Sequence, residues 1–346
     1  MKILITGATG YIGNQLAKKL AAQGEEINIL VRDLNSPTLP LAKNITAFKG
    51  DITDPESIAL AIKDCTHVYH CAAIAKLSLR DKNAFKKVNI SGTKNILEAS
   101  LAAKVQKLVF TSSAAVFGPT LNVPFTETSY RIEPFESDYD LSKYEAENLV
   151  REFVVKGLNA MIVNPSRVYG PGPSTYSNAV NRMIKLLLNK KILLLPKIEN
   201  YITNYCYIDD VVNGHILAMQ HGVVGENYIL GGENISYKKL LQKITAYTAT
   251  KNHVVKIPVP ILKVVAFVAH LVNRKTELTP SLITRFAKNR LLSSEKAIKN
   301  LGYCITPFDE AIKTTIDSIK DDNYKSKNIH TKLYYYGQDQ VSTRTS

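Results

Sequence analysis

Tyr139 and Lys143 have side chains that could together transfer a proton. They stand four positions apart in 139–156, a stretch of helical composition, so a helix would present both on one face. A phenol titrates near about 10 and is a poor base at neutral pH. An ammonium about 4 Å away stabilises its anion by roughly 4 kcal/mol at an effective dielectric of about 20, which lowers the pKa by up to roughly 3 units. We therefore expect Lys143, with a helix start capped by Ser137 or Asp138, to make Tyr139 an acid–base residue.

Position along the chain, rather than spacing, singles out this pair. Tyr247 and Lys251 have the same spacing, as chance allows in a chain with 18 tyrosines. Tyr139, however, follows Ser113, which stands just after a predicted strand at 107–112. A serine there could donate a hydrogen bond to a substrate oxygen while the phenol transfers the proton, which is general acid catalysis with an electrophilic helper. A hydroxyl that only caps the strand end is the other interpretation of this serine.

Three glycines near the start of the chain predict how a dinucleotide could be held beside these residues. They lie between an apolar run at 2–6, suited to a central parallel strand, and a helical stretch at 14–23. Gly7 allows the tight turn, Gly10 lets the backbone approach a pyrophosphate, and Gly13 lets the helix pack against the strand. The phosphates would face free amides and the positive end of a helix dipole. An ordinary strand-to-helix turn is the alternative, but both flanks favour dinucleotide binding.

Short apolar runs alternate with helical stretches through the first part of the chain. The expected strands are 2–6, 27–31, 47–49, 67–71, 107–112 and 160–163, and the expected helices are 14–23, 55–63, 83–103 and 139–156. Such alternation implies right-handed crossovers. It predicts an α/β fold with a Rossmann-type doubly wound parallel sheet, followed by a smaller, mostly helical C-terminal substrate-binding region.

Beyond Pro165 this alternation gives way to turns rich in proline and glycine, with helical stretches at 177–189 and 237–248. We expect a dinucleotide-binding domain at 1–165, to which a segment near 203–220 returns, a substrate-binding region at 166–202 and 221–320, and a polar tail at 321–346 without assigned function. The substrate-binding region should cover the carboxyl edge of the sheet, where ligands bind in open α/β folds.

An apolar run at 258–272 is interrupted by Pro260 and Lys263 and is too short to span a bilayer. We interpret it as a buried helix or a wall of the substrate pocket in preference to a membrane-surface contact.

Charge and cysteine usage restrict the class of protein further. The net charge is +14, but Lys and Arg are spread along the chain, which favours a solvated basic surface that steers anionic ligands over a nucleic-acid site. An acidic membrane surface stays open as a partner. Cys65, Cys71, Cys206 and Cys304 form no Cys-x-x-Cys pair, so we expect neither a disulfide framework nor a metal site, but reduced core residues in a cytoplasmic protein. The chain starts on a predicted strand, so no cleavable signal peptide is expected.

The order of the motifs resembles that of the extended short-chain dehydrogenases/reductases, within the NAD-dependent epimerase/dehydratase superfamily. The motifs are Thr6–Gly13, Gly50–Asp54, His70–Ala73, Val88–Thr93, Phe110–Ser113, Tyr139–Lys143 and Pro165–Pro171. The resemblance covers roughly the first 320 residues. It implies a catalytic triad of Ser113, Tyr139 and Lys143.

The resemblance also implies a set of cofactor-binding residues. These are Gly7, Thr9, Gly10, Tyr11, Ile12, Gly13, Arg32, Asp51, Ile52, Ala72, Ala73, Thr111, Tyr139, Lys143 and Pro165. Asp51 and Ile52 would flank the adenine, Ala72 and Ala73 would line the nicotinamide-side ribose and phosphates, and Pro165 would lie against the nicotinamide.

Two further positions have structural roles by the same resemblance. Asn89 is expected to brace the cofactor loops rather than to catalyse. Asp210 is expected to be structural, and Asp209 with Asp210 lacks the further ligands that a metal requires.

Arg32 decides the expected cofactor. It follows the second predicted strand, where dinucleotide folds place an acid on the ribose hydroxyls for NAD or a basic group near the phosphate for NADP. Its guanidinium could bind a 2′-phosphate, so we expect NADP in preference to NAD. The adjacent Asp33, and stacking of Arg32 on the adenine as its only role, leave NAD open.

Two branches of the family resemble this chain in different segments. Val31–Asp33 and Tyr228–Asn234 are similar to the dihydroflavonol reductase and 3β-hydroxysteroid dehydrogenase-like branch, which acts on ketones and secondary alcohols. This implies an NAD(P)-dependent oxidoreductase that transfers a hydride between nicotinamide and a carbonyl or alcohol carbon of an apolar small molecule, with Tyr139 as acid and base. Ser113–Gly118 also resembles nucleotide-sugar epimerases and dehydratases, where Phe117 would usually be tyrosine.

An epimerase or dehydratase with tightly held NAD is therefore the alternative. A non-catalytic dinucleotide-sensing protein is a third, against which the complete triad argues. The expected partners are a small-molecule substrate and, as is common in the family, a second copy in a homodimer. Nucleic acid and membrane contact are not expected.

Overall fold

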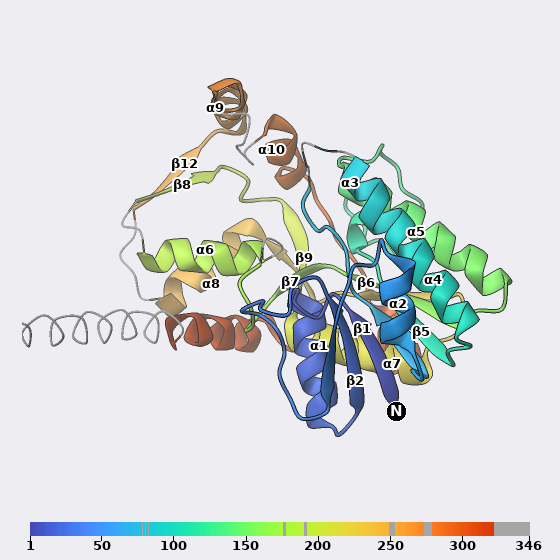
Figure 1. Cartoon of the computed structure of the whole chain (residues 1–346). Coiled ribbons are helices and arrows are strands. Elements are labelled where there is room, and N and C mark those ends of the chain that lie inside the picture. Colours follow the sequence, from blue (N-terminus) through green and yellow to red (C-terminus); the bar gives the residue numbers. More distant parts are fainter. Residues whose placement is uncertain are drawn as a thin grey trace, which may run out of the picture.

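A single parallel sheet organises the larger part of the molecule (Figure 1). The computed structural model describes residues 1–77, 79, 81, 83–175, 178–189, 192–248, 253–272 and 279–321. Within these residues the sheet has seven strands, in the order β10-β6-β5-β4-β1-β2-β3. They are β1 (Lys2–Thr6), β2 (Glu26–Val31), β3 (Ile45–Lys49), β4 (His67–His70), β5 (Lys107–Thr111), β6 (Ala160–Pro165) and β10 (Asn227–Leu230). The predicted α/β, doubly wound fold is confirmed.

Helices cover both faces of this sheet, because its strands are apolar on both sides. Ile3 and Ile5 of β1 pack in the core shared with α1 (Tyr11–Ala22) and α7 (Ile208–His221). Leu4, between them, points to the other core, beneath α2 (Pro55–Ile62), α4 (Gly92–Ala102) and α5 (Asp138–Val155). Side chains alternate between the faces of a strand, so one five-residue run contributes to both layers.

The strand order reverses beside β1, and this reversal fixes the place of the ligand crevice. After β1 the chain moves to β2 and β3 on one side and then crosses to β4, which pairs with β1 on the other. In open α/β sheets ligands bind outside the carboxyl ends of the strands at this reversal. The segments that emerge there are the glycine turn after β1 and residues 71–73 after β4.

The expected helix at 83–103 is divided into three pieces. These are α3 (Asn83–Phe85), the π-helical segment η1 (Lys86–Ser91) and α4. The other predicted helices and strands of the first domain are present, with ends that differ by a few residues from those expected.

The C-terminal region contains two small sheets as well as helices. One has the order β11-β9-β7 and the other pairs β12 with β8. The elements are β7 (Arg167–Tyr169), α6 (Ala179–Asn189), β8 (Ile192–Pro196), β9 (Ile202–Tyr207), β11 (Glu233–Ser236), α8 (Tyr237–Thr248), β12 (His253–Ile257), α9 (Val259–Val272), α10 (Pro280–Phe286) and α11 (Glu295–Leu301). Residues 308–321 form a further helix, and the predicted tail lies outside the described residues from 322 onward.

The expected division of the chain needs two corrections. β10 pairs with β6, so residues 227–230 belong to the large sheet and not to the substrate-binding region. In the segment near 203–220, only α7 packs on the large sheet, whereas β9 lies in a small sheet between β7 and β11.

The apolar run at 258–272 is the clearest departure from expectation. It forms α9, which projects from the body of the molecule at the top of Figure 1. Ala266 is buried, but seven large apolar side chains of this helix are at least 49% exposed. The prediction of a buried helix is therefore wrong, because among the described elements α10 is the main one that packs on it. Among the described residues, no helix combines the length and the apolarity that crossing a membrane requires.

Candidate active site

The glycine turn after β1 is crowded by backbone atoms at two of its three glycines. Gly7 has φ +75°, and a Cβ there would lie 2.7 Å from the amide nitrogen of Ala72. A Cβ on Gly13 would lie 2.4 Å from the carbonyl oxygen of Gly7. Both positions therefore require glycine, as predicted for a tight turn and for close packing of the helix.

Gly10 is less crowded and leaves room for a ligand. The nearest atom to a Cβ there is the Gly7 carbonyl oxygen, at 3.1 Å. Gly10 is also the N-cap of α1 and has no side chain to satisfy the first amides of that helix. A cradle of free amides at the positive end of a helix fits the pyrophosphate of a dinucleotide.

A buried chain of hydrogen bonds fixes residues 71–73 beside this turn. Thr93 Oγ1 donates to the Asn89 carbonyl at 2.6 Å and so accepts from His70 Nε2 at 3.0 Å. His70 Nδ1 then accepts from Thr6 Oγ1 at 2.7 Å, and Thr6 Oγ1 accepts from the amide of Ala72 at 3.3 Å. Burial lowers the pKa of His70 to about 3, so the ring is neutral. One ring nitrogen therefore donates and the other accepts, and all the hydrogen bonds of the series run in the same direction. The ends of β1 and β4 are thereby joined to the start of α4.

Asn89 in η1 braces the loop after β4, as predicted. Its Oδ1 accepts from the Ile74 amide at 2.7 Å, and its Nδ2 donates to the Ile74 carbonyl at 3.2 Å and to Ser142 Oγ at 2.9 Å. Ser142 Oγ donates in turn to the Tyr139 carbonyl at 2.8 Å. One buried amide thus connects the loop beside the glycine turn to the first turn of α5.

The structure brings the Ser113 and Tyr139 hydroxyls together. Ser137 caps α5 by accepting from the Asp140 amide at 3.2 Å, which places Tyr139 in the first turn of the helix. The hydroxyl of Ser113, which follows β5, interacts with Tyr139 and lowers the pKa of its phenol. Ser113 also accepts from the Ala115 amide at 3.2 Å and caps a short 3₁₀ turn, so it has both of the roles considered for it.

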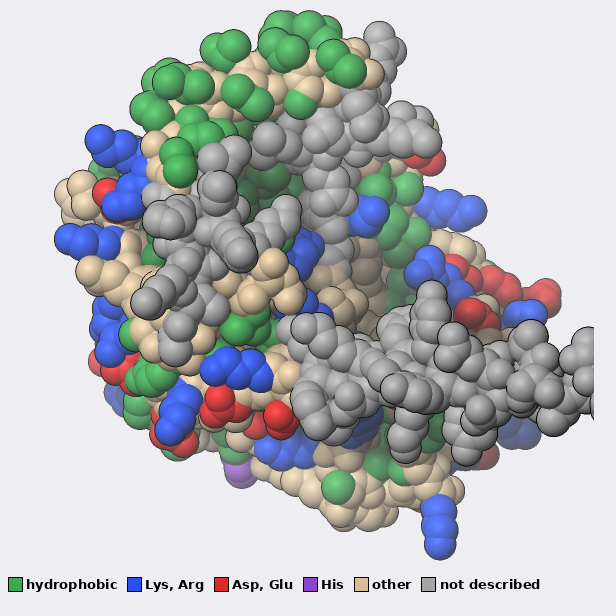
Figure 2. All heavy atoms as spheres, turned by 90° about the vertical axis from the view of Figure 1, so that its left-hand side faces the viewer, with side chains coloured by type: hydrophobic (Ala, Val, Ile, Leu, Met, Phe, Trp, Pro, Cys, Tyr) green, Lys and Arg blue, Asp and Glu red, His purple; other side chains and the backbone are tan. Residues whose placement is uncertain are grey.

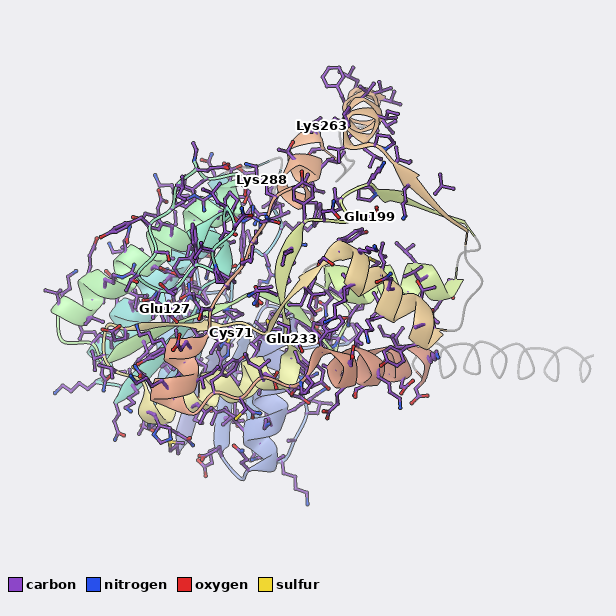
Figure 3. The ribbon with its side chains drawn as sticks, turned by 180° about the vertical axis from the view of Figure 1, so that it is seen from behind. Cys71, Glu127, Glu199, Glu233, Lys263 and Lys288 are labelled. Carbon is purple, nitrogen blue, oxygen red and sulfur yellow. The ribbon has the colours of Figure 1, made fainter. Side chains whose placement is uncertain are left out.

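Lys143 lies one turn further along α5 and is 1% exposed. Its Nζ donates to the Thr111 carbonyl at 2.7 Å and lies 4.1 Å from the centre of the Phe110 ring. The lysine therefore fastens α5 to the end of β5, beside Ser113. Figure 3 shows Cys71, at the end of β4, near the middle of the molecule.

The pKa values of the pair differ from expectation. Burial raises the pKa of Tyr139, Asp140 acts in the same direction, and the Ser113 hydrogen bond and the charge of Arg285 oppose them. Burial lowers the pKa of Lys143 to about 7, although Glu147 raises it. The predicted lowering of the tyrosine pKa by the lysine is therefore wrong for this structure. Both groups are buried, and the cost of desolvating a charge is the largest cause of each shift.

Glu147 and Asn164 support the triad and were missed from the sequence. Glu147 is 2% exposed, accepts from Asn164 Nδ2 at 2.6 Å and pairs with Arg151 at 3.1 Å. Asn164 Nδ2 also lies 3.3 Å from the Ser113 carbonyl oxygen. The i, i+4 spacing of Lys143 and Glu147 on one helix was the available signal.

An ion pair between distant segments joins the C-terminal region to this helix. Asp140 is fully buried, and both of its oxygens accept from the guanidinium of Arg285 in α10. Arg285 also lies 3.5 Å from Glu136, which pairs with Arg290. The pair places α10 directly beside the residue that follows Tyr139.

The predicted adenosine-side residues lie at the ends of β2 and β3. Arg32 is exposed and makes no hydrogen bond or ion pair within the described part of the chain. Asp33 is also exposed, and its Oδ1 accepts from the Asn35 amide at 2.9 Å. Asp51 Oδ1 accepts from the Thr53 amide at 2.8 Å, and the side chain of Ile52 is 6% exposed in the core.

Several other predicted cofactor residues already make hydrogen bonds within the protein. Tyr11 is 5% exposed and its hydroxyl donates to the Gly170 carbonyl at 2.7 Å, so only its backbone faces the turn. Thr111 Oγ1 bonds to His215 Nε2 at 2.9 Å and to Cys71 Sγ at 3.2 Å. The Thr9 carbonyl accepts from Thr38 Oγ1 at 2.9 Å. Cofactor contacts of these residues, and of Ile12, Ala72, Ala73 and Pro165, remain predictions.

Several remaining expectations concern residues outside the site. Both oxygens of Asp210 accept from Thr306, at 2.8 and 2.6 Å, which matches the expected structural role. Cys65 and Cys206 are buried as expected, but Cys304 is exposed and is not a core residue. Lys251, the partner of Tyr247 in the competing pair, lies outside the described residues.

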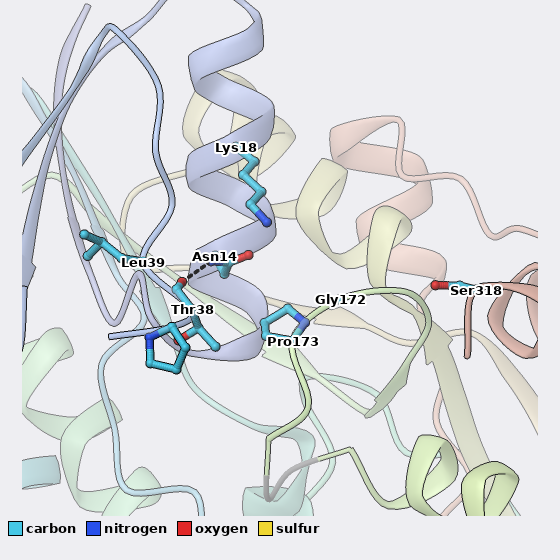
Figure 4. Close-up of a pocket in the computed structure, with 8 residues that line it drawn as sticks. Asn14, Lys18, Thr38, Leu39, Gly172, Pro173 and Ser318 are labelled. Atoms are coloured by element: carbon cyan, nitrogen blue, oxygen red, sulfur yellow. Dashed lines mark hydrogen bonds between the residues drawn. The ribbon is translucent and has the colours of Figure 1, made fainter. Parts of the chain in front are cut away.

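A polar pocket of 370 Å³ lies beside α1, away from the triad (Figure 4). Asn14 and Lys18 of α1, the loop around Thr38 and Gly172 with Pro173 contribute to its lining. Asn14 Nδ2 donates to the Thr38 carbonyl at 2.6 Å, so the polar groups here hold the loop after β2 against α1. Its lining includes none of the three catalytic candidates.

The fold and these residues define a dinucleotide-dependent enzyme of the extended short-chain dehydrogenase/reductase type. Residues 3–231 match the family described as the NAD dependent epimerase/dehydratase family, and the chain belongs to it. The enzymes of this family are NAD(P)-dependent oxidoreductases, and so is this protein.

Three proteins illustrate the range of its relatives. "Sterol demethylase protein B" of Methylococcus capsulatus is 28% identical over 300 residues, which are 86% of this chain and 89% of that protein. A "3-beta-hydroxysteroid dehydrogenase" of Mycolicibacterium neoaurum is 26% identical over 333 residues, which are 87% of this chain and 86% of that one. The crystal structure of the Thermus thermophilus UDP-glucose 4-epimerase complex with NAD is 25% identical, with a TM-score of 0.76 and coverage of 92% and 99%.

Proposed function

We propose that this enzyme interconverts a ketone and a secondary alcohol on an apolar small molecule, with Tyr139 as the acid and base. The observation that carries the proposal is the meeting of Tyr139, in the first turn of α5, with Ser113 after β5 and with Lys143, which donates to the Thr111 carbonyl at the carboxyl end of the same strand. Two of the relatives described above are named for sterols, which supports an apolar substrate.

The residues of the crevice fit a dinucleotide, because the turn from β1 to α1 requires glycine and presents free amides. When bound, the nicotinamide supplies or accepts the hydride. Tyr139 is protonated at neutral pH, since burial raises its pKa. In the reductive direction its hydroxyl donates a proton to the carbonyl oxygen, and Ser113 donates a hydrogen bond to the same oxygen. Lys143, fastened to Thr111, keeps the start of α5 against β5.

The test is an absorbance assay of the purified chain with ketones, secondary alcohols and nucleotide sugars. We expect turnover of an apolar ketone or alcohol, and a decrease in kcat of about 10²–10⁴-fold in Tyr139→Phe with the dinucleotide still bound. Tyr144→Phe is the matched control, because this tyrosine is 42% exposed on the same helix. Epimerisation of a sugar without any change in nicotinamide absorbance would establish the alternative, which the likeness to UDP-glucose 4-epimerase supports.

We further propose that NADP is preferred to NAD. Arg32 is exposed at the end of β2 without a partner in the described residues, while the Asp33 carboxylate is engaged by the Asn35 amide. A free guanidinium suits a 2′-phosphate better than it suits two ribose hydroxyls. Arg32→Gln should raise the KM for NADPH by about 10–100-fold, the equivalent of one charge-assisted contact, and leave the KM for NADH nearly unchanged. Equal effects on both cofactors would refute this preference.

A further inference from the structure

We propose that α9 is a docking helix that seats this enzyme on the surface of an anionic phospholipid bilayer. Its apolar face consists of Ile261, Val264, Val265, Phe267, Val268, Leu271 and Val272, which are 49–84% exposed. At 100° per residue these positions cover an arc of roughly 160° on one side of the helix. Soluble monomers rarely expose a contiguous apolar surface of this kind without a partner.

The location of α9 lets a flat surface reach this face. The helix stands at one extreme of the molecule, next to α10 and the small sheet of β8 and β12 (Figure 1). In the space-filling view, hydrophobic side chains gather into a cap at that end, and the Lys and Arg side chains lie below it (Figure 2). A projecting apolar cap above a basic surface is the arrangement of a helix that lies in a membrane interface.

The charge of the residues near α9 indicates which kind of lipid surface the helix would bind. The chain has a net charge of +14. Among the described residues of 253–290, Lys256, Arg285, Lys288 and Arg290 pair with carboxylates, which leaves Lys263 of α9 as the free cation. Lys263 lies about 40° outside the apolar arc, where its stem can follow the helix and its ammonium can reach lipid headgroups. Within the described residues it has no hydrogen bond or ion pair, and Figure 3 shows it on α9 above Lys288. Basic residues around an apolar face favour anionic lipids.

The length of the helix decides between lying on the membrane and crossing it. Its 14 residues span about 21 Å, less than the hydrocarbon thickness of about 30 Å. The helix therefore lies in the plane of the interface.

This docking would also bring the substrate-binding region to the bilayer. α10 lies beside α9, and its Arg285 pairs with Asp140, which follows Tyr139 in the chain. An apolar substrate dissolved in the bilayer would then enter close to the triad. This second step rests on the proposed function, whereas the docking itself does not.

Co-sedimentation of the full-length chain with vesicles tests the docking without any substrate. The vesicles are phosphatidylcholine alone, and phosphatidylcholine with about one third phosphatidylglycerol. We expect binding to the anionic vesicles to be at least about tenfold tighter, and to weaken as salt is added. The double variant Phe267→Ser/Leu271→Ser should lose at least about tenfold in affinity, because both side chains leave the apolar face.

A matched double variant keeps the test specific. Val123→Ser/Val155→Ser removes side chains that are 71% and 89% exposed elsewhere, and should bind within about twofold of the wild type. Lys263→Gln should weaken binding to anionic vesicles and leave binding to neutral ones unchanged.

Three outcomes would overturn the proposal. They are absence of vesicle binding by the wild type, equal binding by wild type and the α9 double variant, and a dimer in light scattering that this variant converts to a monomer. In the last case a second copy covers the face. A negative substrate panel would refute the proposed function and leave the vesicle result standing.

Discussion

Two buried histidines should make the fold unstable in mild acid. His70 and His215 are both 0% exposed. Burial lowers the pKa of His70 to about 3 and that of His215 to about 4, from 6.5 in an exposed histidine. His215 Nδ1 donates to the Val211 carbonyl at 2.7 Å, so its Nε2 is free to accept from Thr111 Oγ1. A second proton on either ring would be buried with no acceptor in place.

The sign and size of the effect follow from linkage. Between pH 6.5 and the folded pKa values, the unfolded chain binds protons that the folded chain excludes, so stability falls as the pH falls and is fully present above about 6.5. From pH 7 to pH 5 each ring contributes a loss of about 2 kcal/mol. Together the two rings remove about 4 kcal/mol, a large share of the 5–15 kcal/mol typical of a folded protein.

Urea unfolding at pH 7 and pH 5 measures this loss. The variant His215→Gln should lose about 2 kcal/mol less than the wild type over the same pH change, whatever its stability at pH 7. His221→Gln is the control, because this histidine is exposed at the end of α7 and belongs to neither buried chain. If the wild type and His215→Gln lose the same free energy between the two pH values, the argument from burial is refuted.

Three further substitutions test the packing around the site. Gly13→Ala puts a Cβ 2.4 Å from the Gly7 carbonyl oxygen, so we expect a loss of about 1–3 kcal/mol in urea unfolding and at least tenfold weaker NADPH binding by fluorescence; unchanged binding would contradict the close packing. Asn89→Ala leaves backbone groups of the loop after β4 unpaired, and should cost about 1–3 kcal/mol and raise the KM for NADPH. Arg285→Met leaves the buried carboxylate of Asp140 without its cation and should cost about 3–5 kcal/mol in the same unfolding assay, whereas an effect under 1 kcal/mol would show that the pair contributes little.

The first domain was predictable because its signals are local. A run such as 2–6 is buried on both faces and is followed at once by a glycine, so composition alone indicates a central strand. Tyr139 and Ser113 were expected together because Ser113 follows a parallel strand at the ligand-binding edge of the sheet and because the family resemblance places both residues in one triad. In contrast, β7, β9 and β11 are short strands of a mixed sheet that no helical or strand periodicity distinguishes from loop.

The parts of the fold and site that could not be predicted depend on contacts between residues that no local sequence pattern encodes. Asp140 and Arg285 pair across 145 positions of the chain. The π-helical turn Lys86–Ser91, which places the Asn89 side chain against the Ile74 backbone, has no signature in the residue pattern. The apolar run of α9 was wrongly predicted to be buried for a related reason. Apolar composition predicts that a helix is shielded from water, but it does not say whether the core of the same protein or an external surface shields it.

Burial of the site sets the protonation states of Tyr139 and Lys143, and through them the chemistry that the site can perform. The same burial that raises the pKa of Tyr139 lowers that of Lys143 to about 7, so the resting pair is a neutral phenol beside an amine that loses its proton far more readily than an exposed lysine does. This state is prepared to give a proton to a carbonyl oxygen, and it avoids enclosing two unscreened charges. Alcohol oxidation requires the opposite, a phenolate, which a positive charge brought beside the ring would favour. An oxidised nicotinamide, when bound in the crevice, would supply a charge of that sign, and Tyr139 would then act as the base.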